Sequence, residues 1–204
     1  GFAVDPSEVN TALKDHQKAI VCWAVAGGRR AIFAAFGLGK TCIELEVARI
    51  ILSRLGPGKR ALIVLPLGVR QEFKRDAVRV LGWADPPLFV RRLEEVLQAE
   101  AAAVSMALPA AQPNAGIYLT NYETVRDGKL DPADFDVVLL DEAAILRGFG
   151  GSKTFRELML LCTGDGGPTG RVRDKRVRYR FVATATPAPN EYIELLAYSE
   201  FLGI

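Results

Sequence analysis

The sequence predicts an α/β fold, in which a parallel β-sheet is flanked by helices on both faces. Two observations lead to this prediction. Short segments rich in Val, Ile, Leu and Phe alternate along the chain with longer segments of helical periodicity. The short segments are apolar almost throughout, which is typical of strands that are covered on both faces. Ligands of such sheets bind at the carboxyl ends of the strands, so polar residues directly after a strand are the first candidates for a functional site.

Six strands and six helices are expected. In chain order, the strands occupy residues 31–35, 61–65, 88–90, 116–119, 137–140 and 181–184. The helices occupy residues 15–26, 41–55, 69–81, 93–106, 152–161 and 190–201. Repeated strand–helix alternation indicates a parallel sheet. No internal repeat and no linker divides the chain, so we expect one domain over residues 1–204.

Local features set the borders of several elements. The first strand ends at a glycine-containing turn, and the amphipathic segment 41–55 after this turn has the pattern of a helix. The alanine-rich segment 99–111 favours a helix that ends near Pro109. Residues 164–170 are rich in Gly, Pro and Thr, and therefore predict a loop before the last strand.

The composition excludes several function classes. Half of the 204 residues are hydrophobic and a quarter are charged, as in an ordinary globular protein, and the net charge of +2 gives no overall argument for nucleic acid. The only histidine is His16, so a histidine-based zinc site or a Ser-His-Asp triad has almost no material. The three cysteines are scattered among apolar residues and predict free thiols in a reducing compartment.

No apolar run approaches the length of a membrane span, and no signal peptide is present. We therefore expect no membrane partner and an intracellular location, in the cytoplasm or with the nucleoid. The chain starts at Gly1 without methionine and stops at Ile204 directly after a predicted helix. Both ends predict a piece of a longer protein.

A candidate phosphate-binding loop follows the first strand. Residues 34–41 read AAFGLGKT, between that strand and the helix 41–55. Glycines allow backbone N–H groups to curl around phosphate oxygens, and the helix N-terminus adds partial positive charge. This context predicts a nucleoside triphosphate site that uses Gly37, Leu38, Gly39, Lys40 and Thr41, with Lys40 on the outer phosphates and the Thr41 hydroxyl on Mg²⁺. Ala34 stands where the usual pattern has its first glycine, and a Gly-rich turn with a chance lysine is the alternative.

The second half of the candidate site is Asp141-Glu142, at the end of the apolar strand 137–140. An Asp at a strand tip is suited to bind Mg²⁺, and the following Glu to polarise the water that attacks the γ-phosphate. We therefore predict Lys40, Asp141 and Glu142 as the catalytic group. The structural alternative is that Asp141 caps the next helix and Glu142 is a solvated residue of its first turn.

Seven segments together resemble the first lobe of superfamily-two helicases, and most closely the Swi/Snf-type DNA translocases. They lie in the family's order at residues 13–17, 37–41, 62–66, 120–124, 141–144, 183–190 and 194–202, and they cover nearly the whole chain. The resemblance implies a RecA-like lobe that binds ATP and Mg²⁺, with duplex DNA as the favoured partner and RNA not excluded. It also implies a second RecA-like lobe of the same protein, without which we expect weak ATP binding and slow hydrolysis at most.

The resemblance carries over further roles onto matching residues. Gln17 would read adenine, and Thr184 and Thr186 would relay the nucleotide state to the nucleic acid. Phe2 is a candidate to stack on adenine. The candidates for nucleic-acid contact are Pro66, Thr120, Tyr122, Arg147 and Lys153. Tyr122 as a core aromatic, and Arg147 and Lys153 as solvated residues, are the alternatives. Two departures from the family pattern concern the coupling of nucleotide state to nucleic acid. Ala144 replaces the histidine of D-E-A-H in the segment 141–144, and Ala185 replaces a glycine in the segment 183–190.

Three functional hypotheses remain. The leading one is an ATP-driven nucleic-acid motor, represented here by its first lobe. The second is a non-motor module that binds nucleotide or DNA without converting one into work. A small-molecule kinase with a phosphate loop is the weakest, because it leaves the segments at 62–66, 120–124 and 183–190 unexplained. The basic run at 171–180 has two interpretations: it follows a phosphodiester backbone, or it is a solvated loop that leads into a strand.

Overall fold

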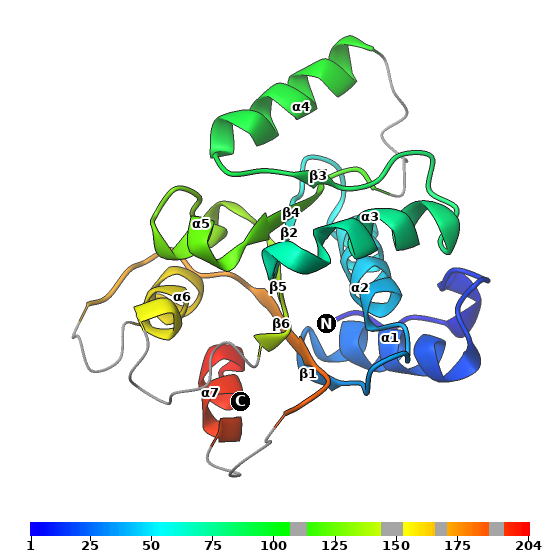
Figure 1. The fold of residues 1–204 in the computed structure, drawn as a ribbon, viewed down its shortest axis with the longest axis horizontal. Helices are drawn as coiled ribbons and strands as arrows, with labels where there is room; N and C mark the ends of the chain where they lie inside the picture. The colour runs from blue at the N-terminus through cyan, green and yellow to red at the C-terminus, as the bar shows by residue number, and fades with distance from the viewer. Residues whose placement is uncertain (107–113, 144–152, 166–170, 188–193) are drawn as a thin grey trace.

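The computed structural model describes residues 1–106, 114–143, 153–165, 171–187 and 194–204. These residues form one six-stranded sheet with helices on both sides (Figure 1). Every strand pair is parallel. The predicted α/β fold with a helix-flanked parallel sheet is therefore confirmed.

The strand order in the sheet is β1-β6-β5-β2-β4-β3. The strands are β1 (Arg29–Phe33), β2 (Ala61–Leu65), β3 (Leu88–Phe89), β4 (Ile117–Asn121), β5 (Val137–Asp141) and β6 (Tyr179–Thr184). In this order β6, which comes last in the chain, lies between β1 and β5. The strand that leads into the phosphate loop and the strand that ends in Asp141 therefore share one neighbour.

The α-helices are α1 (Asp15–Gly27), α2 (Lys40–Leu55), α3 (Arg70–Arg79), α4 (Leu93–Ser105), α5 (Tyr122–Arg126), α6 (Lys153–Thr163) and α7 (Glu194–Leu202). Three short 3₁₀ turns are η1 (Pro6–Glu8), η2 (Leu67–Val69) and η3 (Pro132–Asp134). Figure 1 shows α1, α2 and α3 on one side of the sheet and α5, α6 and α7 on the other. None of the described helices is long and apolar enough to cross a membrane.

Two apolar cores lie on the two faces of the sheet, and strand β5 shows how they form. Val137 and Leu139 belong to the core under α1, α2 and α3, whereas Val138 and Leu140 belong to the core under α5, α6 and α7. Successive strand residues point to opposite faces, so a strand that is covered on both sides must be apolar at every position. This explains the uniform apolar runs of the sequence.

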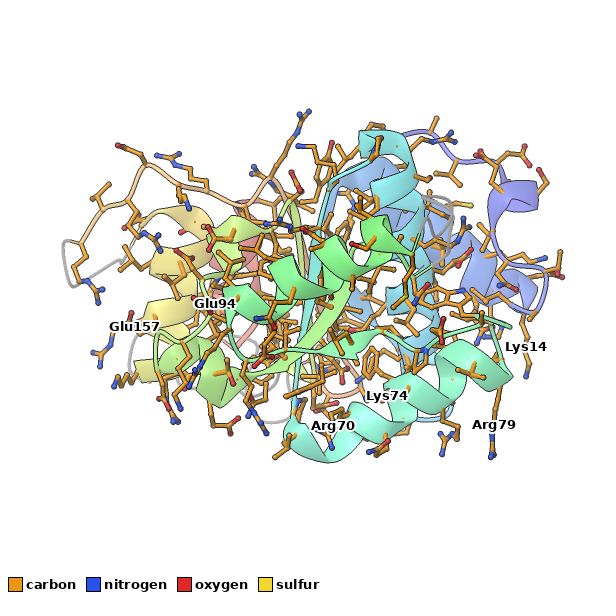
Figure 2. The ribbon with its side chains drawn as sticks, turned by 90° about the horizontal axis from the view of Figure 1, so that it is seen from above. Lys14, Arg70, Lys74, Arg79, Glu94 and Glu157 are labelled. Atoms are coloured by element: carbon orange, nitrogen blue, oxygen red, sulfur yellow. The ribbon has the colours of Figure 1, made fainter. Side chains whose placement is uncertain are left out.

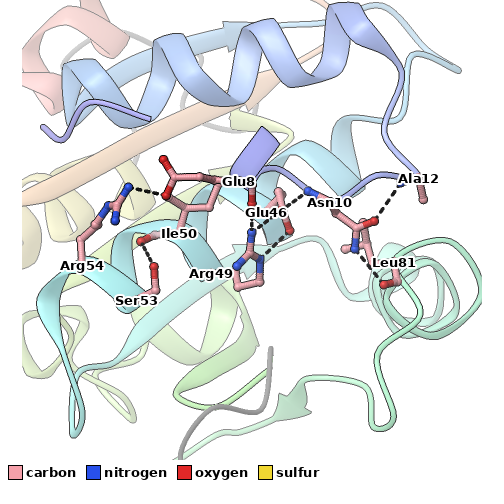
Figure 3. Close-up of polar contacts among 9 residues, drawn as sticks. All are labelled: Glu8, Asn10, Ala12, Glu46, Arg49, Ile50, Ser53, Arg54 and Leu81. Carbon is pink, nitrogen blue, oxygen red and sulfur yellow. Dashed lines mark hydrogen bonds and ion pairs between the residues drawn. The ribbon is translucent and has the colours of Figure 1, made fainter. Parts of the chain in front are cut away.

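Helix α2 is buried along most of its length, including two glutamates that an amphipathic pattern would place in solvent. Glu46 accepts hydrogen bonds from the Asn10 backbone N–H at 2.7 Å and from Arg49 Nε at 2.9 Å (Figure 3). Arg49 also donates to the Glu8 carbonyl at 2.9 Å, and Asn10 Nδ2 donates to the Leu81 carbonyl at 2.9 Å. This network attaches the N-terminal segment to α2 and to the chain after α3.

Several borders differ from those expected. Strands β1 and β6 each begin two residues earlier than predicted, at Arg29 and Tyr179, because Arg29, Arg30 and Arg180 take part in the parallel ladder. The short helix α5 was not predicted. All three cysteines are free, in agreement with the sequence.

The expectation that Phe2 stacks on adenine is wrong. Its ring stacks on Tyr179, with the ring centroids 5.7 Å apart. Tyr179 is the first residue of β6, and therefore lies at the amino edge of the sheet, opposite the phosphate loop. Phe2 is a packed residue of the chain terminus.

Candidate functional site

The candidate phosphate loop connects the end of β1 to the start of α2. Gly37 and Gly39 have φ angles of 80° and 75°, in the left-handed region that glycine adopts without steric cost. Gly39 precedes the first turn of α2. Ala34, at the position of the missing glycine, is buried and continues the ladder by donating to the Thr184 carbonyl at 3.2 Å. The alanine therefore belongs to the sheet, and the turn proper starts after it.

Gln17 joins α1 to this loop. Its Oε1 accepts from the Lys14 backbone N–H at 2.8 Å, and its Nε2 donates to the Leu38 carbonyl at 2.8 Å. A Cβ at Gly39 would lie 2.2 Å from Gln17 Nε2, so the two residues are in close contact. Gln17 is positioned beside the loop that it was predicted to serve, and its contact with adenine stays a prediction.

Lys40 meets both predicted carboxylates. Its Nζ lies 2.9 Å from Glu142 Oε2 and 3.1 Å from Asp141 Oδ1. Lys40 begins α2 at the end of the phosphate loop, whereas the carboxylates follow β5 about one hundred positions later. The structure therefore brings together the three residues that the sequence selected as the catalytic group.

Burial and charge act against each other at this cluster. Burial alone would lower the pKa of Lys40, but the Asp141 and Glu142 carboxylates outweigh it and raise that pKa. Burial raises the pKa of Asp141, and the attraction of Lys40 offsets only part of the rise. Asp141 is only 3% exposed, so its charge depends on Lys40 as the nearby cation.

Glu142 has a strained backbone. Its φ angle of 49° is in the left-handed region, and no other described residue apart from glycine has a positive φ. A non-glycine residue held there costs about 1–3 kcal/mol, and such strain clusters at functional sites. The neighbouring carbonyl of Asp141 accepts a hydrogen bond at 2.7 Å from the hydroxyl of buried Tyr122. Tyr122 thus helps to hold the peptide that turns Glu142 toward Lys40.

Thr184 links the carboxylates to the end of β6. Its Oγ1 donates to Glu142 Oε1 at 3.2 Å and accepts from the Thr186 backbone N–H at 3.1 Å. The β6 strand lies between β1 and β5, so Thr184 sits between the phosphate loop strand and the Asp-Glu strand. The relay by Thr184 and Thr186 stays a prediction, and these two hydrogen bonds would be its route.

Sequence reasoning missed Glu44. This side chain is completely buried in α2, and neither carboxylate oxygen has a hydrogen-bond partner among the described residues. Burial raises its pKa well above the usual range, and the charge of Asp141 raises it further. Glu44 follows Lys40 by one helical turn, and residues four apart share a helix face. That spacing was the signal in the sequence.

The residues present fit a magnesium ion. Thr41 is buried in the first turn of α2 and offers a hydroxyl, while Asp141 offers a carboxylate. The buried Oδ1 of Asp141 lies within ion-pair distance of Lys40 but has no partner in hydrogen-bond geometry. Hard oxygen ligands of this kind, completed by phosphate oxygens and water, are what Mg²⁺ prefers.

The five candidates for nucleic-acid contact separate into groups. Thr120 and Tyr122 are buried, and their hydroxyls donate to the Val90 and Asp141 carbonyls at 2.7 Å each. These two side chains have no surface to offer to a nucleic acid, so the prediction fails for them and the core alternative holds for Tyr122. Pro66 follows β2, and Lys153 is exposed at the start of α6. Arg147 lies outside the described residues.

The basic run is largely bonded within the chain. Arg180 is buried and donates to the carbonyls of Val177, Phe201 and Leu202 at 2.7, 2.6 and 3.0 Å. Burial, with a smaller contribution from Arg29, lowers the pKa of Arg180 to about 10. Ion pairs connect Arg171 to Glu157, Arg173 to Asp131 and Lys175 to Asp134. The run leads into β6 at the amino edge of the sheet. These contacts favour a structural role in the loop and strand over contact with a phosphodiester backbone.

Comparisons with known proteins find no matching family description and no matching curated protein. Solved structures do match. The SWI2/SNF2 ATPase core of Sulfolobus solfataricus, solved in complex with double-stranded DNA, is 17% identical with a TM-score of 0.67 over 98% of this chain and 38% of its own. The UvsW helicase of bacteriophage T4 is 14% identical, with a TM-score of 0.57 over 91% and 57%. The Hef helicase domain of Pyrococcus furiosus is 17% identical, with a TM-score of 0.58 over 93% and 36%.

The chain thus spans about two fifths of the SWI2/SNF2 core and somewhat more than half of the UvsW helicase. At these identities the likeness concerns the fold. The order of strands and helices and the matches to three helicase-type structures agree on it. The chain therefore has a RecA-like α/β fold, similar to that of the matched part of these structures, as the sequence predicted.

Proposed function

We propose that this chain is the first ATPase lobe of an ATP-dependent nucleic-acid motor, either a helicase or a double-stranded DNA translocase. One observation carries the proposal. Lys40, at the end of the phosphate loop, lies within 3.1 Å of both Asp141 and Glu142 at the carboxyl end of β5. Binding and polarising a triphosphate needs a cation on the phosphates, a ligand for the metal and a base for water, and the cluster supplies one residue for each.

The residues divide the work as follows. The backbone of Gly37, Leu38 and Gly39 and the ammonium of Lys40 bind phosphate oxygens. Thr41 and Asp141 would hold Mg²⁺, which when bound neutralises charge on the phosphates. Glu142 orients the attacking water and accepts its proton.

Recognition and coupling fall to other residues. Gln17 would contact the base of the nucleotide, and its hydrogen bond to the Leu38 carbonyl beside the loop supports this role. Thr184 bonds Glu142 and reports its position to Thr186. Each side chain is within reach of the loop or of Glu142, which supports these roles.

The proposed partners are DNA and a second RecA-like lobe. Duplex DNA is favoured, because the SWI2/SNF2 core with the TM-score of 0.67 was solved with double-stranded DNA; RNA remains an alternative substrate. The chain covers only 38% of that core, which supports the need for a further lobe to complete the ATP site. We therefore expect weak ATP binding and little hydrolysis from residues 1–204 alone.

The test combines binding and turnover. Binding of a fluorescent ATP analogue to residues 1–204 is measured with and without Mg²⁺, and ATP turnover is measured on the natural chain extended beyond Ile204, with duplex DNA, single-stranded DNA or RNA. Stimulation mainly by duplex DNA supports a translocase, and stimulation mainly by single strands or RNA supports an unwinding helicase. Turnover by residues 1–204 as fast as that of the extended chain would contradict the need for a second lobe.

Two variants test the assigned roles. Lys40→Ala should abolish nucleotide binding. Lys18→Ala is the control and should bind like the wild type, because Lys18 is a lysine of α1 that has no ion pair among the described residues. Glu142→Gln should bind nucleotide and lose turnover, and an active Glu142→Gln protein would refute its role as the base. Binding without turnover under every condition would favour the non-motor module, which Ala144 and Ala185 also motivate.

A further inference from the structure

Two arginines share one aromatic ring at the border of the sheet. The guanidinium carbons of Arg70 and Arg91 lie 5.0 and 5.6 Å from the ring centroid of Phe89. Phe89 ends the border strand β3, Arg91 follows it by two residues, and Arg70 begins α3. A cation within about 6 Å of a ring centroid is attracted by the ring quadrupole. Phe89 therefore holds two cations at one ring, with their guanidinium carbons no farther apart than the sum of these two distances. Their mutual repulsion would be offset by an anion bound between them.

The described part of the chain supplies no anion for this pair. Neither Arg70 nor Arg91 forms an ion pair with any described carboxylate. The nearby Glu95 carboxylate accepts the backbone N–H of Arg91 at 2.9 Å, which is a contact to the main chain and not to the guanidinium. Arg92 and Lys74 add two more cations to the neighbourhood, and neither has an ion-pair partner in the described part of the chain. Figure 2 shows Lys74 beside Arg70 on α3 and Glu94 well apart from both.

The two arginines lie at the same edge of the sheet as the candidate ATP site but belong to other strands. Arg91 follows the carboxyl end of β3 and Arg70 follows that of β2, so both lie at the sheet edge that carries Lys40 and Asp141. The strands β1 and β3 form opposite borders of the sheet. Five strand spacings of about 4.8 Å separate these borders by roughly 24 Å. Arg91 therefore lies at the border far from the phosphate loop, whereas Arg70 follows β2, which is three spacings or roughly 14 Å from β1.

We propose that Arg70 and Arg91, both held against the ring of Phe89, form a phosphate-binding site for the sugar–phosphate backbone of a nucleic acid. Guanidinium groups match phosphate oxygens with two parallel hydrogen bonds, and two guanidiniums on one ring fit one or two successive phosphates of a strand. The inference rests on the proposed function, because it takes the nucleic acid from there. It adds two arginines that the sequence had not singled out, and it replaces the buried Thr120 and Tyr122 as the contact at this end of the edge.

The experiment measures binding of a short fluorescent DNA duplex and of the matching single strand between about 50 and 200 mM salt. Arg70→Ala and Arg91→Ala should each weaken binding about tenfold and reduce the slope of log K against log salt by about 0.9 per lost phosphate contact. Arg79→Ala is the matched control, because it removes the same charge at the opposite end of α3 (Figure 2) and should change neither quantity.

Phe89→Leu separates a positioned pair from simple positive charge. It keeps an apolar side chain but removes the ring, so it should weaken binding when both arginines are present and have no effect in the Arg70→Ala/Arg91→Ala background. Thermal unfolding of each variant identifies any that fails to fold, and binding of the fluorescent ATP analogue should stay unchanged in all of them.

The outcomes are distinct. Wild-type affinity and salt slope in Arg70→Ala and Arg91→Ala would overturn the site and leave the proposed function standing. An equal loss in Arg79→Ala would also overturn it, since the binding would then depend on diffuse charge. If the wild type binds neither duplex nor single strand, this site and the nucleic-acid part of the proposed function both fail, while the separate nucleotide titration decides the ATP part.

Discussion

Lys40 should stabilise the fold as well as bind phosphate. Replacing it by methionine keeps most of the aliphatic stem and removes the cation that lies within 3.1 Å of both Asp141 and Glu142. Removing one partner of a buried ion pair costs about 3–5 kcal/mol. The side chain of Lys40 is 16% exposed and that of Glu142 30% exposed, so solvent screens part of the charge. We expect Lys40→Met to lose about 2–3 kcal/mol of unfolding free energy at neutral pH.

The loss should depend on pH with a defined sign. Burial raises the pKa of Asp141 even beside Lys40, and without Lys40 this pKa rises further. An acid whose pKa is raised in the folded protein does not lower the free energy of unfolding below its unfolded pKa of about 3.9. Above that pH it lowers this free energy increasingly, until the pH reaches the folded pKa. The destabilisation by Lys40→Met should therefore be larger at about pH 7 than at about pH 5.

Urea unfolding without nucleotide or metal gives the measurement, on the wild type, Lys40→Met, Asp141→Asn and the double variant. Asp141→Asn removes the charge that Lys40 balances, so the double variant should recover about 1–3 kcal/mol relative to additive losses. A Lys40→Met protein within about 0.5 kcal/mol of wild type at both pH values would refute the ion-pair argument. So would strict additivity in the double variant.

Three further predictions concern single residues. Gly39→Ala and Gly37→Ala should each lower the free energy of unfolding by about 1–2 kcal/mol, because alanine is disfavoured in the left-handed region. In urea unfolding Gly39→Ala alone should lose about 1 kcal/mol more, because its Cβ displaces Gln17 from the Leu38 carbonyl. Arg180→Met should lose about 2–4 kcal/mol and speed amide hydrogen exchange in α7, since the carbonyls at its C-terminus lose their donor; unchanged exchange in α7 would argue against this. Glu44→Gln should stabilise the protein, with a gain near zero at about pH 4 that grows toward neutral pH, because burial raises the pKa of Glu44; a gain independent of pH would contradict the assignment.

Uniform apolar runs were predicted well. Strand β2 has the predicted bounds, Ala61–Leu65, because every side chain in it is buried and apolar. Strand β6 was predicted two residues short, because Arg180 in its second position looked like a solvent-facing residue. Its guanidinium is instead buried against three carbonyls supplied partly by α7, about twenty positions later. A partner so distant in the sequence cannot be read from local pattern.

The candidate site shows the same division. The residue types of Lys40, Asp141 and Glu142, each next to a strand or helix border, were sufficient to select them. The left-handed backbone of Glu142 and the hydrogen bond from Tyr122 to the Asp141 carbonyl depend on how the start of α5 meets the end of β5, and no property of the residues alone predicts them. The cation pair at Phe89 was missed for the same reason, since β3 and α3 meet only in the folded chain.

The contact between Glu142 and Lys40 has a consequence for how nucleotide affinity is interpreted. Without ligand, the carboxylate of Glu142 occupies the ammonium that a phosphate group would need, so Glu142 acts as an internal competitor of ATP. Every measured dissociation constant then contains the free energy of separating this pair. A Glu142→Gln variant weakens the competitor and should bind nucleotide more tightly even before any turnover takes place. Tight binding by that variant is therefore a property of its resting state, and only a direct measurement of turnover reports on its chemistry.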